Sequence, residues 1–362
     1  MTVEIEEDVS LAPPLLPASA GRFPRRIIAV SAGVLLAALI IGLWYWKRPK
    51  PDFQINSVAV LPLKAVDDTE NSRILGLGLT DALITKIGSL KTVIVRPLSA
   101  VAKFTDTDAL EMGRKLNVDA VLEGAIYQAD GRIRLNVRLL KVETGEQLWA
   151  EKFERQASQV FDLEDNLSEE TARALGLKLG SGETERLTKR YTTNAEAHHA
   201  YVRGRNLWNR RTSNDLRQSI EYFNEAIRKD PQYALAYVGL ADAYSLLADY
   251  SGALPAETYP KAKEAATKAL ELDDQLAEAH TSLAYVKMYY DWDWQGAEHE
   301  FRRAISLNPN YAGARQWYAE YLTAMGRFDE ALAEIRRAKE IDPLSPIINA
   351  GEVWTLYFAR RY

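Results

Sequence analysis

The side chains that most often perform chemistry in proteins are scarce in this sequence. It contains no cysteine and four histidines in 362 residues, which excludes disulfides and thiolate metal sites. His198 and His199 are neighbours, and consecutive helical residues point about 100° apart, so this pair cannot share one metal ion. No H-E-x-x-H pattern occurs. The sequence therefore predicts no catalytic residue, no metal site and no cofactor, and we expect a protein that is not an enzyme.

Two glycine pairs match nucleotide-binding loops only in part. Gly76 and Gly78 form G-x-G, but the third glycine of the dinucleotide fingerprint and a directly preceding strand are absent. We interpret both as positions where a helix packs closely on a sheet. The segment 180–182 reads G-S-G without the following G-K-[ST] of a phosphate-binding loop, so a flexible joint is predicted there.

Two charge clusters have both a functional and a structural interpretation. The acidic cluster is Asp67, Asp68 and Glu70, and the basic cluster is Arg132, Arg134 and Arg138. The acidic residues lie in one loop and could meet a divalent cation, although a solvated turn is the preferred interpretation. The arginines alternate along a strand and could meet an anionic partner, although a solvated sheet face is preferred.

The residues that could bind a partner belong to a repeat near the carboxyl end of the sequence. Pro309 and Pro343 are 34 residues apart, and this period, with small residues before each proline, resembles the tetratricopeptide (TPR) repeat. Two-helix units are predicted to start at Ala195, Ala234, Ala277, Ala312 and Pro346. The fifth unit reaches Tyr362 before its second helix, so we expect the natural chain to continue and to cover the apolar residues of that unit.

The first helices of TPR units line a concave groove that takes a peptide or a partner helix. Eight groove candidates follow from their positions in the units: Arg203, Asn206, Asp242, Ser245, Tyr285, Tyr289, Gln316 and Glu320. Tyr285 and Tyr289 share a helix face, which predicts an aromatic centre, with Asp242 and Glu320 as an acidic rim. The expected partner is a basic or neutral extended segment with an apolar anchor. The alternative is that both tyrosines pack against the next repeat.

One TPR binding mode is not expected. Chaperone-binding TPR proteins hold an acidic carboxyl terminus with Lys and Asn at the fifth and ninth positions of a unit. The second unit has Val238 and Asp242 there, and the fourth has Gln316 and Glu320. The sequence therefore does not predict binding of an acidic carboxyl-terminal tail.

Before the repeats, the hydrophobic pattern predicts an α/β domain. Strands are expected at 57–63, 92–96, 120–127, 132–141 and 147–153, and helices at 74–90, 106–116 and 161–175. The order β-α-β-α-β-β-β-α implies parallel pairing first and an antiparallel meander afterwards. Asp130-Gly131 is predicted to form a tight hairpin turn.

These strands and turns, SVAVLPL, GLGLTDALITKI, VDAVLEGAIYQADGRIRLNVRLLKVETGEQLWAEKFER and FDLEDNLSEETARAL, resemble the TolB amino-terminal and FlgO-like domains. The resemblance covers about residues 57–175. It implies an extracytoplasmic, non-catalytic module. An apolar run at 27–46 that could anchor the chain in a membrane precedes this domain. The combination of membrane anchor, TolB-like domain and TPR array is also similar to CadC-like regulators, which carry a winged-helix DNA-binding domain before the anchor.

An uncharged apolar run of 20 residues, 27–46, is long enough for a helix of ~30 Å that crosses a bilayer. Its length and bulky end argue against the alternative, a cleaved signal peptide. Three basic residues flank each side, so charge does not decide the orientation. The TolB-like resemblance implies that the carboxyl-terminal domains lie outside the cytoplasm. A single-pass protein of the inner (cell) membrane is therefore predicted.

The predicted organisation has six parts: a tail (1–26), a transmembrane helix (27–46), a linker (47–55), the α/β domain (56–178), a second linker (179–194) and the TPR repeats (195–362). With 45 basic and 50 acidic side chains, net −5, no nucleic-acid partner is expected for these residues. The predicted function is a membrane-anchored, non-enzymatic scaffold that binds a protein or peptide in its TPR groove. The alternative is part of a CadC-like transcription regulator whose DNA-binding domain is missing.

Overall fold

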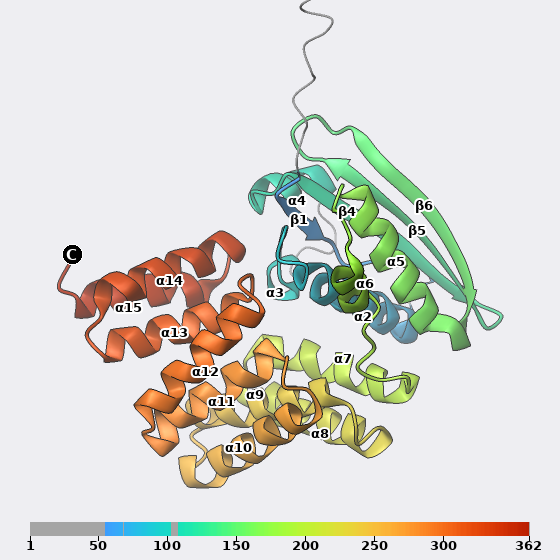
Figure 1. Cartoon of the computed structure of the whole chain (residues 1–362). Helices are drawn as coiled ribbons and strands as arrows, with labels where there is room; N and C mark the ends of the chain where they lie inside the picture. The colour runs from blue at the N-terminus through green and yellow to red at the C-terminus, as the bar shows by residue number, and fades with distance from the viewer. Residues whose placement is uncertain (1–54, 68, 103–107, 362) are drawn as a thin grey trace, which may run out of the picture. The chain divides into compact units, whose positions relative to one another are not determined.

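The computed structural model describes residues 55–67, 69–102 and 108–361, and the elements keep the labels of Figure 1. The predicted transmembrane run, 27–46, lies outside the described residues. Within the described ranges, no helix is long and apolar enough to cross a membrane. Residues 54–362 form one compact unit that contains both the α/β domain and the repeats.

The α/β domain is built on one mixed sheet (Figure 1). Its strands are β1 (Ser57–Val60), β2 (Lys64–Ala65), β3 (Ile94–Val95), β4 (Ala120–Ala129), β5 (Arg132–Lys141) and β6 (Gln147–Gln156). The order is β3-β1-β4-β5-β6, with β2 paired to β4. β1 is parallel to β3 and β4, whereas β4, β5 and β6 form an antiparallel meander. Both predicted kinds of pairing are confirmed, and β2 is an addition that the sequence pattern did not predict.

Helices cover both faces of this sheet because alternate residues of its strands point to opposite sides. The helices are α2 (Glu70–Gly88), α3 (Leu98–Val101), α4 (Ala109–Lys115) and α5 (Val160–Ala174), the last preceded by the short η1 (Ala157–Gln159). Val58 and Val60 belong to the core beneath α2 and α5, and Ala59 between them belongs to the core beneath α3 and α4. Asp130 and Gly131 have φ values of 51° and 69°, as the predicted hairpin turn requires.

The remaining helices form the TPR solenoid, in consecutive antiparallel pairs (Figure 1). They are α7 (Ala195–Arg210), α8 (Ser213–Lys229), α9 (Ala234–Ser251), α10 (Pro255–Leu272), α11 (Ala277–Val286), η2 (Lys287–Asp291), α12 (Trp294–Leu307), α13 (Ala312–Ala324), α14 (Phe328–Ile341) and α15 (Pro346–Phe358). The short helix α6 (Ser181–Leu187) precedes them and packs on α2 and α5 of the α/β domain. The five predicted unit starts are the first residues of α7, α9, α11, α13 and α15, so the repeat prediction is confirmed. The predicted flexible joint at 180–182 is instead the start of α6.

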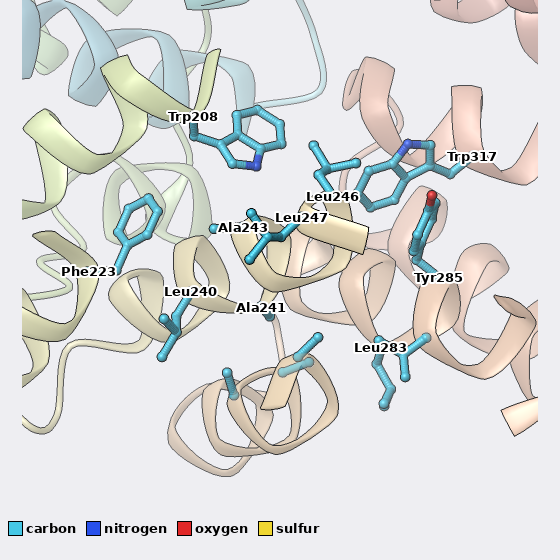
Figure 2. Close-up of a cluster of buried hydrophobic side chains, with 14 of the residues drawn as sticks. Trp208, Phe223, Leu240, Ala241, Ala243, Leu246, Leu247, Leu283, Tyr285 and Trp317 are labelled. Atoms are coloured by element: carbon cyan, nitrogen blue, oxygen red, sulfur yellow. The ribbon is translucent and has the colours of Figure 1, made fainter. Parts of the chain in front are cut away.

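Small residues let neighbouring helices of the solenoid approach closely. Phe223 of α8 is fully buried between Gly204 of α7 and Gly239 of α9 (Figure 2). A Cβ added at Gly204 would lie 2.7 Å from this ring, and one at Gly239 would lie 2.4 Å from it. Glycine is therefore required at both positions by the aromatic ring that fills the space between the helices.

The α/β domain contacts the solenoid at both ends of the repeat array. At α7, a Cβ on Gly78 of α2 would be 3.2 Å from His198 and Val202. At the other end, the buried Arg96 side chain donates to the carbonyls of Glu340 and Ile341, where α14 ends. Since cations are favourable at a helix carboxyl terminus, this guanidinium joins the two parts of the chain.

A second group of hydrogen bonds supports the same contact. Lys91 donates to the carbonyl of Ser306 at 2.9 Å, and Asn310 donates to the carbonyl of Val93 at 3.1 Å. Both partners in the solenoid lie in or just before the loop that leads into α13. The α/β domain is therefore bonded to the end of α12 and to the loop between α12 and α13.

Candidate functional site

The inner surface of the solenoid is formed by α7, α9, α11 and α13, which contact one another in that order. All eight groove candidates lie on these four helices or on η2. The structure divides them into two groups. We call the group around Arg203 and Asp242 the covered half, and the group around Tyr285, Tyr289 and Glu320 the open half.

In the covered half, Asp242 of α9 is only 1% exposed. Its carboxylate is 3.2 Å from the Arg205 guanidinium of α7 and accepts a hydrogen bond from the Ser282 hydroxyl of α11. Burial raises the pKa of Asp242, and Arg205 opposes that effect by stabilising the charged form. Asp242 therefore does not lie at an acidic rim. It is the centre of a polar cluster that joins three helices, and the sequence could not show this because its partners are 37 and 40 residues away.

Arg203, another groove candidate, is bonded to the α/β domain. The guanidinium forms an ion pair with Glu70 of α2 at 2.9 Å and lies 5.7 Å from the centre of the Tyr222 ring. Asn206, one turn later on α7, is half-buried. Arg203 is thus part of a contact within the chain.

In the open half, the two predicted tyrosines have different surroundings. Tyr285 is 5% exposed, and its ring centre is 4.5 Å from that of Trp317 in the next repeat and 4.5 Å from that of Tyr289. Tyr285 therefore follows the alternative interpretation and packs between repeats, as Figure 2 shows. Tyr289 is 40% exposed and keeps an accessible ring.

Two carboxylates hold the hydroxyls of these tyrosines. Tyr285 donates to Asp249 at the end of α9 at 2.7 Å, and the Tyr289 hydroxyl lies 3.4 Å from Glu320 of α13. Gln316 is buried and donates to the other Glu320 oxygen at 3.0 Å. Asp249 is exposed and Glu320 is half-buried, so both remain within reach of a bound molecule.

The electrostatics of the open half differ from those of the covered half. Burial raises the pKa of Asp249, and burial also raises that of Glu320, where the nearby Asp249 charge adds to the increase. Hydrogen bonds from Tyr285 and Gln316 oppose these shifts. Among the described residues, neither carboxylate has a Lys, Arg or His within ion-pair distance. The open half therefore carries acidic groups without a directly bonded cation in the described part of the chain, and the charge of Arg211 acts on Glu320 from a greater distance.

The π-helical segment η2 places Tyr289 at this surface. The helix widens over Lys287–Asp291 and ends at Trp292, whose φ is +57°. Lys287 forms an ion pair with Glu300 of α12 at 2.9 Å, and His280 lies 2.6 Å from the other Glu300 oxygen. Burial alone would raise the pKa of Glu300, but hydrogen bonds from His280 and Lys287 outweigh it and lower that pKa to about 2.

Sequence reasoning did not select Trp208, Asp249 or Trp317. Trp208, near the end of α7, is 7% exposed, and its indole nitrogen has no hydrogen-bond partner in the described part of the chain. Asp249 follows the predicted Ser245 by four residues, so continuing that stripe by one helical turn would have found it. The fully buried Ser245 hydroxyl is also without a hydrogen-bond partner among the described residues.

The other sequence candidates have structural roles. A Cβ on Gly76 would be 2.4 Å from the Leu63 carbonyl oxygen, which confirms that α2 packs closely on the sheet at this position. The same prediction was wrong for Gly78, which packs on α7. Asp67 accepts from the Ser72 hydroxyl at 2.8 Å, and Asp68 lies outside the described residues. His198 packs edge-on against Phe161, and burial lowers its pKa.

The three arginines of β5 pair across the sheet. Arg132 and Arg134 contact Glu154 at 3.3 Å, and Arg138 contacts Glu123 at 2.6 Å. Within residues 55–67, 69–102 and 108–361, no three His, Asp or Glu side chains are grouped so that they could hold a metal ion. These clusters therefore support the structural interpretation of the basic sheet face.

The architecture defines a class of protein: an α/β domain followed by TPR repeats. Family models for the tetratricopeptide repeat match residues 207–259 and 293–350. Residues 54–170 match the model described as "HilA/YgeH-like transcriptional regulator, second domain". The chain thus carries TPR repeats behind a domain like the second domain of these regulators, whereas the TolB-like resemblance stays a prediction.

Curated relatives match over both parts. A Rhizobium meliloti protein named "Putative adenylate cyclase 3" is 30% identical over 235 residues, which are 63% of this chain and 39% of that protein. The Salmonella typhimurium protein "Transcriptional regulator HilA" is 22% identical over 315 residues, 86% of this chain and 55% of that protein. The chain therefore spans about half or less of the length of these relatives.

A solved TPR protein of Thermus thermophilus, TTC0263, is similar to the solenoid. It is 19% identical, with a TM-score of 0.39, and the match covers 56% of this chain and 93% of that one. TPR proteins typically mediate protein–protein interactions and are generally non-catalytic scaffolds.

Proposed function

We propose that this chain is a non-enzymatic interaction module whose open half binds an extended segment of a protein partner. One observation carries the proposal: Tyr289 and Glu320 stay accessible on the inner helices, while Arg203 and Asp242 of the covered half are bonded within the chain. TPR arrays bind peptides along this inner surface, and aromatic residues concentrate binding energy.

Site-specific photo-crosslinking tests this proposal in the full chain. A benzoylphenylalanine at Tyr289 should give discrete adducts with a partner protein in the host cell. The same residue at Glu271, exposed on the outer helix α10, is the matched control and should give none. Equal adduct patterns at both positions would remove the support for binding at the inner surface.

A second candidate function is the regulatory part of a HilA-like transcription regulator. The match to the Salmonella protein favours it, because that match covers 86% of this chain and so spans both the α/β domain and the repeats. In this role the open half would receive a protein signal, and a DNA-binding domain would deliver the output. Exchanging the matched region of the Salmonella regulator for this chain, and measuring its target promoter, tests the idea. A promoter that no longer responds, with the chimera present at normal level, would count against it.

The membrane anchor is part of the same proposal. The uncharged run 27–46 would hold the protein in the inner (cell) membrane, with residues 56–362 outside the cytoplasm. Extraction of membranes with alkaline carbonate should leave the chain in the pellet. Alkaline phosphatase fused after Tyr362 should be active, and a reporter that fluoresces only in the cytoplasm should be dark. The reverse pattern would contradict the orientation.

The name of the Rhizobium protein does not lead us to propose a cyclase. The match spans 39% of that protein, and its name refers to the whole chain. An interaction module is the function that the matched TPR region and the accessible inner surface support.

A further inference from the structure

We infer that the open half recognises an arginine side chain of its partner, which would lie on the Tyr289 ring between Asp249 and Glu320. This inference rests on the proposed function and specifies the chemistry of its partner. We call Asp249, Tyr289 and Glu320 the arginine site.

The first observation is that the two carboxylates of the arginine site have no directly bonded cation among the described residues, although the more distant Arg211 lowers the pKa of Glu320. Asp249 accepts a hydrogen bond from the Tyr285 hydroxyl, and Glu320 accepts hydrogen bonds from Gln316 and Tyr289, but these donors are neutral. Asp242, seven residues before Asp249 on the same helix, has the Arg205 guanidinium as its cation. A cation supplied by a partner would do for the open half what Arg205 does for the covered half.

The second observation is the aromatic surface between the two carboxylates. Tyr289 lies on Tyr285 with ring centres 4.5 Å apart, and Tyr285 is held by Trp317 at 4.5 Å. The exposed ring is therefore supported by buried ones and keeps its orientation. A planar guanidinium can stack on such a ring and donate to carboxylates at its edges, which a lysine ammonium cannot do in the same way.

The third observation is a pair of buried polar groups without partners in the described part of the chain. They are the indole N–H of Trp208 on α7 and the hydroxyl of Ser245 on α9. In Figure 2, Trp208 lies on one side of Leu246, and Trp317 and Tyr285 lie on the other. A buried donor normally has an acceptor. The partly accessible Trp208 indole points to an acceptor supplied from outside, whereas the fully buried Ser245 hydroxyl lies out of a partner's reach.

Together, these positions describe how the partner would run. Trp208, Asp249, Tyr289 and Glu320 come from the carboxyl-terminal halves or ends of four successive inner-helix units. An extended segment that crosses these helices would accept the Trp208 N–H with a main-chain carbonyl and place its arginine in the arginine site. Main-chain hydrogen bonds would supply affinity, and the arginine would supply specificity.

The test uses the full chain and an immobilised array of nine-residue peptides with randomised flanks and one of four central residues. The central residue is arginine, lysine, glutamate or citrulline, the last being a neutral analogue of arginine with nearly the same shape. We expect arginine peptides to be retained about tenfold better than the matched citrulline peptides, since a charge pair at a partly buried site is lost. Lysine should rank between them. Equal retention of arginine and citrulline would overturn the inference.

Substitutions in the chain show which residues cause the preference for arginine over citrulline. Asp249→Asn together with Glu320→Gln should abolish the arginine-over-citrulline preference, whereas Glu271→Gln, an exposed carboxylate on α10, should leave it unchanged. Trp208→Phe removes the N–H but keeps an aromatic ring, so it should weaken arginine and citrulline peptides by the same factor. Circular dichroism of each variant establishes that it is folded before binding is compared.

The outcomes separate the two proposals. Peptide binding that needs Tyr289 but shows no arginine preference would reject the arginine site and keep the proposed function. An arginine preference that survives the double variant would place recognition elsewhere and reject the arginine site. If no peptide is retained and no crosslink forms from Tyr289, the proposed function itself fails.

Discussion

The covered and open halves of the inner surface contain the same kinds of residue but use them differently. In the covered half, Asp242 has Arg205 and Ser282 as partners, and Arg203 has Glu70 of the α/β domain. In the open half, Asp249 and Glu320 contact only neutral donors among the described residues. In this solenoid, an acidic residue on an inner helix is therefore structural where another helix supplies a cation, and available for binding where none does.

The contact of the α/β domain with the solenoid follows the same division. Arg96, Lys91 and Asn310 connect the domain to the loops that precede the inner helices α13 and α15. The carboxyl-terminal ends of the outer helices α12 and α14 and the loop before α13 are therefore engaged within the chain. A binding surface remains toward the carboxyl-terminal ends of the inner helices, where Tyr289 is exposed.

The largest expected effect comes from comparing the two tyrosines. Tyr285→Ala should lower the free energy of unfolding by about 4 kcal/mol, since it removes a buried aromatic ring between repeats. Tyr289→Ala should cost less than about 1 kcal/mol, because its ring is 40% exposed. Urea denaturation followed by circular dichroism measures both. Equal losses would show that Tyr289 is packed as tightly as Tyr285 and would remove it as an accessible binding residue.

The two aspartates of α9 form the next matched pair. Asp242→Asn should destabilise the protein by about 3 kcal/mol, because it leaves the Arg205 guanidinium without its buried partner. Asp249→Asn should change the stability by no more than about 0.5 kcal/mol, since an amide still accepts from Tyr285 and the residue is exposed. Thermal and urea melts of the two variants, compared side by side, decide this. A stable Asp242→Asn protein would contradict the division into two halves.

The ionisation of Glu300 should make the free energy of unfolding depend on pH, because Glu300 holds Lys287 of η2, the segment that carries Tyr289. Its pKa is lowered from 4.5 to about 2, so its stabilising effect is complete above pH 4.5 and is lost as the pH falls toward 2. The linkage corresponds to roughly 3 kcal/mol at most. Glu300→Gln should remove this part of the pH dependence, measured as the free energy of unfolding between pH 6 and pH 2. An unchanged dependence in the variant would assign acid sensitivity to other carboxylates.

The smallest of these effects concerns the contact between domains. Arg96→Lys should cost about 2 kcal/mol, since an ammonium cannot reproduce the guanidinium hydrogen bonds to the ends of both α4 and α14. Hydrogen exchange should quicken at β3 and at the end of α14, while that of α9 stays slow. Faster exchange across the whole solenoid would mean that Arg96 stabilises more than this contact.

The order of the elements follows from local patterns in the sequence. The 34-residue period located the starts of α9, α11 and α13, because repeat spacing and the residues that end helices are local properties of the chain. Alternating hydrophobicity and the Asp130-Gly131 turn determined the β4–β6 meander for the same reason. Helical spacing also placed the groove candidates on the inner helices.

Only the tertiary structure decided which of those candidates are available. Asp242 and Asp249 occupy one helix face at a spacing of two turns, so no local pattern distinguishes them. One is neutralised by Arg205 of α7 and the other is not, and Tyr285 is buried because Trp317 of the next repeat covers it. Burial and charge pairing depend on residues tens of positions away, and their contacts form only when helices and domain pack together.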